Sequence, residues 1–343
     1  MKNKEIKVVN ILLYEKIKNI KNGFYHLNQI VFAYNSNHIE GSRLNKEQTK
    51  HIYETNSFYA HKDGEKIRLD DILETKNHFR AFDFILENYN ATLNEIFIKE
   101  LHKILKQGTT ESIVGEYKKL QNYIGDLKTT SPKQVSQKME TLLDNYNNKK
   151  NITIDDIVDF HFNFESIHPF SDGNGRVGRL IMFKECLKNN IMPFIIDDEH
   201  KAFYYRGLKN YVSQKGFLVD TCLSCQDDYE NTFNDYLNNS NFDLESAYSL
   251  LEKIMSDFPK TNIENNLARL DKALIEQEQS HADYKEKMSK IYDEIHGRES
   301  NVATTNDKEY LAEREAVKKT MDKMEKELDK SAINAVFQRL KDK

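Results

Sequence analysis

The segment His168–Arg179 reads HPFSDGNGRVGR, and it lies between two stretches of helical character. Before it, the apolar residues of Ile154–Glu165 recur at helical spacing, and after Gly175 a second apolar run begins. The glycines between these runs allow positive φ angles and a close approach of the backbone to another group. The segment therefore predicts a helix, a glycine-rich turn and a second, apolar helix.

Helical patterns extend outward from this segment in both directions. The 343 residues include only 12 Gly and 4 Pro, so helix breakers are rarer than in average proteins. Strand-like alternation is scarce, and an extended hairpin is expected only within Gln107–Pro132, where glycines alternate with Tyr, Leu and Ile. We therefore predict an all-α fold with one short hairpin. The expected helices cover about residues 1–22, 24–40, 45–53, 70–85, 93–105, 135–145, 154–165, from 175 onward, and 201–237.

The polar stretch Asn238–Asn241 separates this part from a region of different character. Apolar residues from Leu267 to Ile295 recur at alternating steps of three and four, with polar residues at Gln277 and His281. This spacing predicts a helical hairpin or coiled coil over residues 242–343. Pairing with another copy would make a homo-oligomer, whereas a hairpin would cap the preceding domain, and the pattern favours neither.

The charge and the cysteine content narrow the class of protein. A formal net charge of −5, with both signs intermixed, argues against a dedicated nucleic-acid binder. Three cysteines favour a reducing compartment, and the pair Cys222 and Cys225 has no second pair at metal-ligand spacing, so we expect it to be buried. The N-terminal residues contain no apolar run of the length of a signal peptide or membrane span. We therefore expect a cytoplasmic protein without membrane contact.

The glycine turn has the composition of a phosphate site. Backbone N–H groups of such a turn, leading into a helix N-terminus, bind phosphate oxygens, and Asn174 can add a side-chain amide. Arg176 and Arg179 lie where the helix dipole disfavours cations, which an anion between them would explain. Asp172 offers the hard oxygen ligand that Mg²⁺ requires. His168 titrates in a range suited to taking a proton from a hydroxyl. A turn that only reverses the chain would need none of these charged groups.

The segment matches the signature of the Fic family, H-P-F-x-[DE]-G-N-G-R-x-x-R, at every specified position. The resemblance implies an all-α Fic core over about residues 68–238, with a short β-hairpin called the flap. Gly115–Pro132 resembles that flap, although Lys118 stands where many members carry Arg. Residues 1–67 would then form an N-terminal helical region, and residues 242–343 a C-terminal helical extension.

By this resemblance the chain is a protein adenylyltransferase, which moves AMP from ATP to a Ser, Thr or Tyr hydroxyl of a target protein, itself included. His168 would deprotonate the hydroxyl, and Asp172 would hold Mg²⁺ against the α- and β-phosphates. The intact Gly-Asn-Gly pattern favours AMP transfer over the phosphate transfer of Doc relatives. Tyr205 would contact the base, although an aromatic stripe at helical spacing is also typical of a core. The residues implied to bind the nucleotide are Gly173, Asn174, Gly175, Arg176, Arg179 and Tyr205.

The stretch Ser36–Gly41, SNHIEG, resembles the inhibitory motif of the family, [ST]-x-x-x-E-[GN]. Ser36 and Glu40 share a helix face at i and i+4. A carboxylate paired with Arg179 would take the place of the γ-phosphate, so that ATP binds only unproductively. Two alternatives remain open. Glu40 could orient a water in a de-AMPylase, or the chain could be a non-catalytic scaffold that acts through the C-terminal coiled coil.

Overall fold

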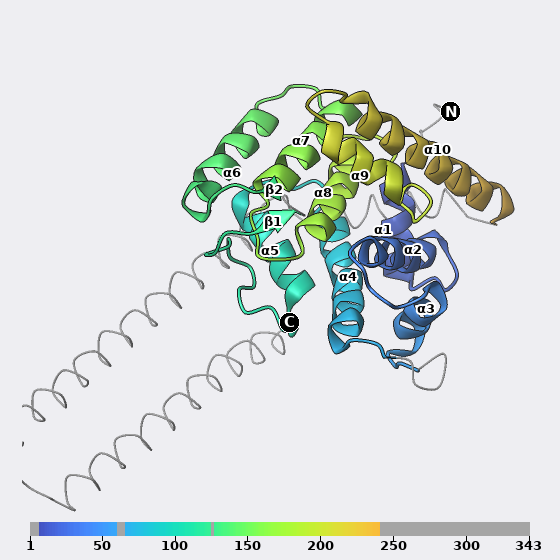
Figure 1. Cartoon of the computed structure of the whole chain (residues 1–343). Coiled ribbons are helices and arrows are strands. Elements are labelled where there is room, and N and C mark those ends of the chain that lie inside the picture. The colour runs from blue at the N-terminus through green and yellow to red at the C-terminus, as the bar shows by residue number, and fades with distance from the viewer. Residues whose placement is uncertain (1–6, 60–65, 125–126, 241–343) are drawn as a thin grey trace, which may run out of the picture. The chain divides into compact units, whose positions relative to one another are not determined.

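The computed structural model describes residues 7–59, 66–124 and 127–240. These residues form a mostly helical fold with one short antiparallel hairpin (Figure 1). The predicted all-α fold is therefore confirmed, whereas the heptad helices predicted over residues 242–343 lie outside the described residues. The elements are α1 (Val8–Lys18), α2 (Phe24–Ile39), α3 (Lys46–Thr55), α4 (Leu69–Glu87), α5 (Glu95–Lys106), β1 (Tyr123–Ile124), β2 (Leu127–Lys128), α6 (Pro132–Asn147), α7 (Ile154–Ile167), α8 (Asn174–Lys188), α9 (Lys201–Asn210) and α10 (Gly216–Asn239).

Helix α8 lies in the middle of the helical core, where it contacts α2, α4, α5 and α7 (Figure 1). Its residues from Asn174 to Leu187 are buried, so it has no solvent-facing side. A helix that is surrounded by other helices is apolar on all sides, which explains the apolar run that follows the glycine turn. Its Lys184 and Glu185 form a buried ion pair of 2.6 Å, because a buried charge needs a partner.

Helix α2 carries the predicted inhibitory motif to the N-terminus of α8. On its buried side, Phe32 packs against Phe82 of α4 and Phe183 of α8, with ring centroids 5.9 and 5.2 Å apart. Burial of one such side chain contributes about 1.5–3 kcal/mol. The helix ends at Ile39, so that Glu40 is its C-cap residue. Aromatic packing along α2 therefore fixes where Glu40 lies.

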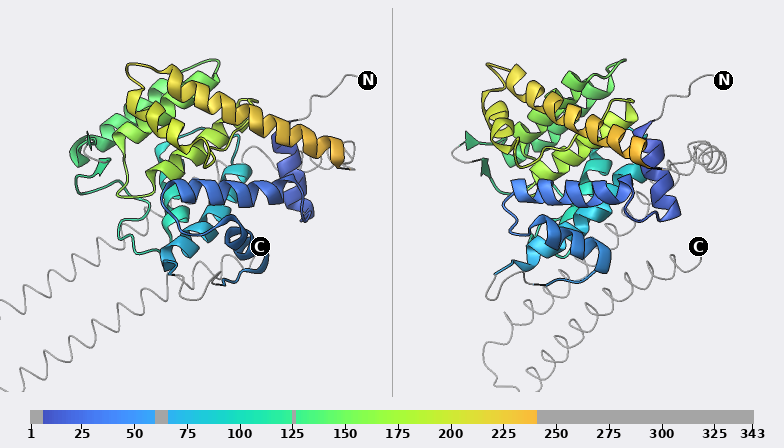
Figure 2. Two further views of the ribbon diagram at one scale, coloured as in Figure 1. Left: turned by 45° about the vertical axis from the view of Figure 1, so that its right-hand side comes forward. Right: turned by 90° about the vertical axis from the view of Figure 1, so that its right-hand side faces the viewer.

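The helical stretch expected over residues 201–237 is divided by a turn into α9 and α10. The two helices pack closely, since a Cβ atom at Gly207 would lie only 2.7 Å from the Cα atom of Leu218. The turn directs α10 back across the core to the N-terminal helices (Figure 2). There Phe24 packs against Phe233 with ring centroids 5.1 Å apart. The turn thus allows α10 to bury an apolar face against the core, whereas an unbroken helix would have pointed this face away from the core.

Capping residues define several of the helix ends. Asn45 is the N-cap of α3, as predicted, and exchanges reciprocal hydrogen bonds of 2.8 and 3.0 Å with Gln48. Thr153 and Asp156 form the same capping box at the start of α7. Among the described residues, no helix has the length and apolar content needed to cross a membrane.

Candidate active site

His168 directly follows α7 in a left-handed conformation, with φ 51° and ψ 63°. Its Nδ1 atom lies 3.3 Å from the backbone oxygen of Glu165. A carbonyl oxygen can only accept a hydrogen bond, so Nδ1 carries the ring proton and Nε2 keeps its lone pair. Burial lowers the pKa of His168 below its usual value, and a neutral imidazole with a free Nε2 can act as a base.

The turn between α7 and α8 depends on two glycines. Gly173, the N-cap residue of α8, has φ 80°, a conformation that other residues rarely adopt. At Gly175 a Cβ atom would lie 2.2 Å from Glu40 Oε1. A side chain there would occupy the space that Glu40 now fills. The turn can therefore admit an acidic group close to its backbone, as expected of an anion-binding turn.

The side-chain amide of Asn174 is not free to donate to an anion, contrary to the expectation from the sequence. Its Oδ1 atom accepts a hydrogen bond of 2.8 Å from the backbone N–H of Phe170, and its Nδ2 atom donates one of 2.9 Å to the Phe170 oxygen. Phe170 is fully buried. The amide of Asn174 therefore holds the turn in shape, and its contribution to anion binding is left to the backbone.

Arg179 is paired with Ser36 and Glu40, the two residues of the predicted inhibitory motif. Its Nη2 atom donates a hydrogen bond of 2.8 Å to Glu40 Oε1, and it also donates 2.8 Å to the backbone oxygen of Ser36. The Nε atom donates to Ser36 Oγ at 3.1 Å. Burial alone would raise the pKa of Glu40, but the charges of Arg179 and Arg176 outweigh it and hold that pKa below its usual value. Glu40 is thus a carboxylate that neutralises Arg179.

Arg176 belongs to a ring of four alternating charges. Its Nη1 atom forms an ion pair with Glu74 of α4, and its Nη2 atom lies 3.2 Å from Asp172 Oδ2. Lys106, at the end of α5, contacts the same Glu74 and donates a hydrogen bond of 2.5 Å to Asp172 Oδ2. Burial would raise the pKa of Asp172, but Arg176 and Lys106 lower it to about 2. Asp172 is therefore ionised at neutral pH.

Glu74 and Lys106 are site residues that the sequence did not reveal. Glu74 lies within an amphipathic helical pattern, where a glutamate is typical of a solvated face. Lys106 lies in the last turn of a helix, where the dipole favours any cation. Both side chains are nevertheless largely buried, with exposed fractions of 9% and 3%. No local pattern distinguishes them, because their partners come from other helices.

His102 joins the glycine turn to the segment that leads into the hairpin. The backbone N–H of Gly115 donates a hydrogen bond of 2.9 Å to His102 Nδ1, so Nε2 carries the ring proton. Nε2 donates a hydrogen bond of 3.1 Å to the backbone oxygen of Asp172. The ring also stacks on Phe170, with centroids 3.8 Å apart. Burial lowers the pKa of His102 to about 4. His102 is therefore a neutral structural link that sequence reasoning also missed.

These charged groups surround a polar cavity of about 500 Å³. The Asp172 side chain is 53% exposed, in contrast to the buried Arg176 and Glu74. An exposed carboxylate oxygen fits a Mg²⁺ ion, which keeps several waters and uses one or two protein carboxylates beside phosphate. The residues that line the cavity are Glu40, Arg68, Asp70, Glu74, Lys106, Thr110, Glu111, Ser112, Asp172 and Arg176.

The hairpin is fastened to the turn by Lys118. The backbone N–H of Lys118 donates a hydrogen bond of 2.8 Å to the Pro169 oxygen, and its Nζ atom donates to Thr129 Oγ1 at 2.7 Å and to the Ile167 oxygen at 3.3 Å. Burial lowers the pKa of Lys118 to about 8. Lys118 thus fixes the base of the hairpin next to His168.

The two tyrosines of α9 differ in their surroundings. Tyr204 is buried, and its hydroxyl lies 2.7 Å from His161 Nε2. Tyr205 is 45% exposed, and its hydroxyl donates a hydrogen bond of 3.0 Å to the Ile39 oxygen, next to Glu40. Tyr204 is therefore a core residue, whereas Tyr205 lies at the surface beside the end of α2.

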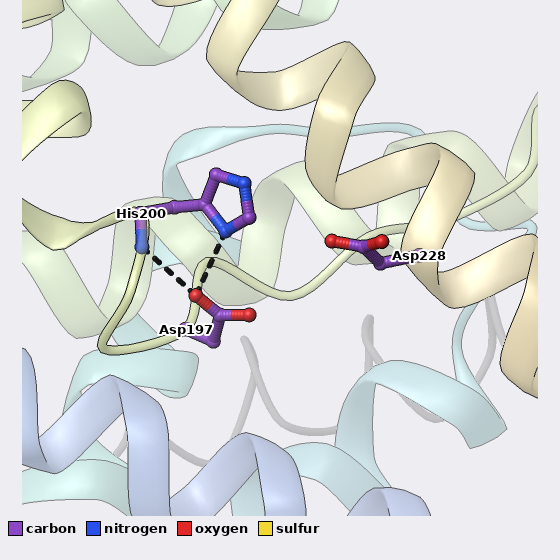
Figure 3. Close-up of side chains that lie close together, drawn as sticks. All are labelled: Asp197, His200 and Asp228. Carbon is purple, nitrogen blue, oxygen red and sulfur yellow. Dashed lines mark hydrogen bonds and ion pairs between the residues drawn. The ribbon is translucent and has the colours of Figure 1, made fainter.

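A second group of side chains comes together around the start of α9 (Figure 3). Asp197, His200 and Asp228 offer ligand atoms within 4.8 Å of one another. Asp197 Oδ1 accepts hydrogen bonds of 2.9 Å from the backbone N–H and 2.8 Å from Nδ1 of His200. His200 Nε2 lies 3.1 Å from Ser224 Oγ. These bonds close the turn that enters α9, so the fold itself uses Asp197 and His200.

Comparison with known proteins places this geometry in a family. Residues 92–186 match the family model described as Fic/DOC family. The chain is 28% identical over 189 residues to protein adenylyltransferase fic-1 of Caenorhabditis elegans, an alignment that covers 52% of this chain and 35% of that protein. It is 29% identical over 219 residues to protein adenylyltransferase Fic of Aedes aegypti, covering 61% and 42%. The chain thus spans less than half the length of these curated relatives.

The fold gives the same result. A Fic domain containing signaling protein from Bacteroides thetaiotaomicron superposes with a TM-score of 0.50 at 26% identity, covering 66% of this chain and 92% of that one. The matched residues 92–186 contain the whole segment His168–Arg179, with its histidine, its glycine turn and both arginines. The chain therefore contains a domain, over residues 92–186, that matches the Fic/DOC family.

Proposed function

We propose that this chain is an enzyme that transfers AMP from ATP to a Ser, Thr or Tyr hydroxyl of a protein, and that Glu40 holds it in check. The observation that carries the proposal is the placement of His168, with a free Nε2 lone pair, beside a glycine turn flanked by Arg176 and Arg179. The relatives named protein adenylyltransferase support the same reaction.

In the proposed reaction, His168 Nε2 takes the proton of the target hydroxyl while its oxygen attacks the α-phosphorus. A P–O bond to the target forms, the P–O bond to the β-phosphate breaks, and pyrophosphate leaves. A positioned base of this kind contributes about 10²–10⁴ in rate. The backbone of the glycine turn and the two guanidinium groups bind the phosphate oxygens. Because the backbone donors of the turn are already in place, they stabilise developing charge without reorganisation.

The proposed cofactors are ATP as the AMP donor and Mg²⁺ at Asp172. A Mg²⁺ ion bound there would neutralise phosphate charge and help to align the leaving pyrophosphate. Lys106 and Arg176 hold the Asp172 carboxylate from the other side. The carboxylate is thereby kept ionised and oriented toward the cavity.

The restraint follows from the contacts of Glu40. Arg179 is 3% exposed and already has Glu40 and Ser36 as partners. A γ-phosphate can pair with Arg179 only if Glu40 withdraws, since one guanidinium edge cannot serve both anions. We therefore infer that Ser36 and Glu40 together hold the enzyme in a restrained state.

Labelled ATP tests the proposed reaction. Label from the α-phosphate on protein, absent with His168→Ala, is the expected result. Label from the γ-phosphate would indicate phosphate transfer instead. Release of AMP from a previously modified protein would indicate the reverse, de-AMPylating reaction, and no turnover of either kind would leave a scaffold role. Mass spectrometry of a lysate treated with the Glu40→Gly variant would identify the target proteins.

The place of action is also a proposal. Cys186, Cys222 and Cys225 are the three cysteines of the chain, and all are free and buried. Such thiols favour a reducing compartment, so we propose action on proteins of the cytoplasm.

A further inference from the structure

Glu165 lies one helical turn before His168 and faces it. Its Oε2 atom is 3.7 Å from His168 Nδ1, and its side chain is only 12% exposed. Its other oxygen, Oε1, is buried and has no hydrogen-bond partner among the described residues. A Cβ atom at Gly178 of α8 would lie 2.9 Å from this Oε1. A carboxyl group is thus packed between the proposed base and the backbone of α8, with half of its hydrogen-bonding capacity unused.

The groups that face this carboxyl come from four helices. Arg179 of α8 is the cation, Glu40 at the end of α2 is the competing carboxylate, and Tyr204 of α9 is a neutral neighbour. His161 lies one turn earlier on α7, and the positive charge of Lys118 in the hairpin segment adds to the effect of burial in lowering the pKa of His168.

In the restrained arrangement, Glu165 keeps its proton. Burial first, and then the nearby charge of Glu40, raise the pKa of Glu165 to about 8, against a smaller opposing effect of Arg179. Arg179 already has Glu40 as its carboxylate partner at 2.8 Å. A second buried carboxylate beside the first would repel it, and like charges at one site are not both ionised.

We propose that Glu165 is a positioning residue that couples Glu40 to His168, becoming the carboxylate that balances Arg179 and holds the Nδ1–H of His168 once Glu40 withdraws. The Glu165 proton then passes to solvent, and one carboxylate remains next to Arg179 in either state. Withdrawal of Glu40 would therefore free Arg179 for phosphate and, at the same time, orient the base. The inference rests on the proposed function in taking His168 as the base and Glu40 as the restraint.

The coupling has a measurable sign. Loss of the Glu40 charge alone lowers the pKa of His168, because a nearby negative charge is removed. If Glu165 ionises in response, a closer negative charge appears 3.7 Å from the ring and the pKa rises instead. If Glu165 only fills space and does not ionise, loss of the Glu40 charge should still lower the pKa of His168.

Histidine NMR on the full-length chain separates these outcomes without requiring any enzymatic turnover. The His168 resonance is assigned by its loss in His168→Ala, and its titration is followed in phosphate-free buffer for wild type, Glu40→Gln, Glu165→Gln and the double variant. In the wild-type background, we expect Glu40→Gln to raise the pKa of His168 by about one unit. In the Glu165→Gln background, we expect the same substitution to lower the pKa of His168 or to leave it unchanged. An equal response to Glu40→Gln in both backgrounds would overturn the coupling.

Gln is isosteric with the protonated Glu165, so Glu165→Gln should fold, with a thermal midpoint near pH 6 at least as high as that of wild type. If Glu165→Gln does not fold, Glu165→Asp can be used in its place. Its carboxyl is shorter by one methylene, so Glu40→Gln should raise the pKa of His168 by less in this background. In the Glu40→Gln background, the acid limb of the kcat/KM profile for AMP transfer should move to lower pH with Glu165→Gln. Absence of AMP transfer with the NMR coupling intact would contradict the proposed function alone.

Discussion

Lys106 Nζ lies 2.5 Å from Asp172 Oδ2 and donates a hydrogen bond to it. One oxygen of the carboxylate proposed to bind Mg²⁺ is therefore already bound to a protein ammonium group. The same ammonium also contacts Glu74, which pairs with Arg176. The ring formed by Glu74, Arg176, Asp172 and Lys106 is therefore charge-balanced before any nucleotide enters. A Mg²⁺ ion at Asp172, as proposed, would bind against the repulsion of two neighbouring cations, Lys106 and Arg176.

Replacing Lys106 by Met should make Mg²⁺ bind more readily. We expect the Mg²⁺ concentration for half-maximal AMP transfer to fall about fivefold, or ~1 kcal/mol, the upper range for an ion pair with an exposed partner. The measurement is a Mg²⁺ titration at saturating ATP. Lys103→Met is the matched control, because Lys103 lies on the same helix and pairs with Glu100 instead. A higher Mg²⁺ requirement in Lys106→Met would show that the lysine orients Asp172 more than it competes with the ion.

Removing the carboxylate of Glu40 should activate the enzyme. Glu40→Gly frees Arg179, and gain of one preorganised donor to the transferring phosphates corresponds to about 10² in rate. Transfer of label from α-labelled ATP, including self-modification, measures the effect. The double variant with His168→Ala should show no transfer. An unchanged rate at saturating ATP and Mg²⁺ would contradict the inhibitory role.

The buried carboxyl of Glu165 should make stability depend on pH. In the folded protein its pKa is raised from 4.5 to about 8, so between these values the folded state holds a proton that the unfolded chain has lost. The free energy of unfolding should therefore fall as pH rises, by about 1.4 kcal/mol per pH unit at most. Urea unfolding from pH 5 to 8 measures this, and Glu165→Gln should flatten the curve. A parallel decline in both proteins would show that Glu165 ionises freely when folded.

The α9–α10 contact should depend on the absence of a side chain at Gly207. A Cβ atom there would meet the backbone of Leu218 at 2.7 Å, and overpacking of this kind costs about 1–3 kcal/mol. Gly207→Ala should lower the free energy of urea unfolding by that amount. Gly216→Ala is the control, because its Cβ would meet only Asp220 Oδ2 at 3.7 Å. Equal effects of the two substitutions would argue against close backbone packing.

Local signals in the sequence predicted much of the fold. Asn45 and the helical spacing around it correctly predicted the start of α3. The scarcity of glycine and proline correctly predicted a mostly helical fold, and the pattern of Gln107–Pro132 predicted the one hairpin found among the described residues. The division between α9 and α10 was missed because no proline marks it, and close packing of Gly207 on Leu218 accompanies it. Local periodicity cannot show where a helix must turn back to bury its face.

The sequence by itself determined the groups that lie within a few residues of one another. His168, the glycine turn, Asp172 and the two arginines follow in one segment of twelve residues, and helix geometry alone places Ser36 one turn before Glu40. Only the tertiary structure decided the partners of the charges. Glu74 with Arg176, and Lys106 with Asp172, come from different helices, because a buried charge needs an opposite charge beside it and the packing of helices decides which one that is.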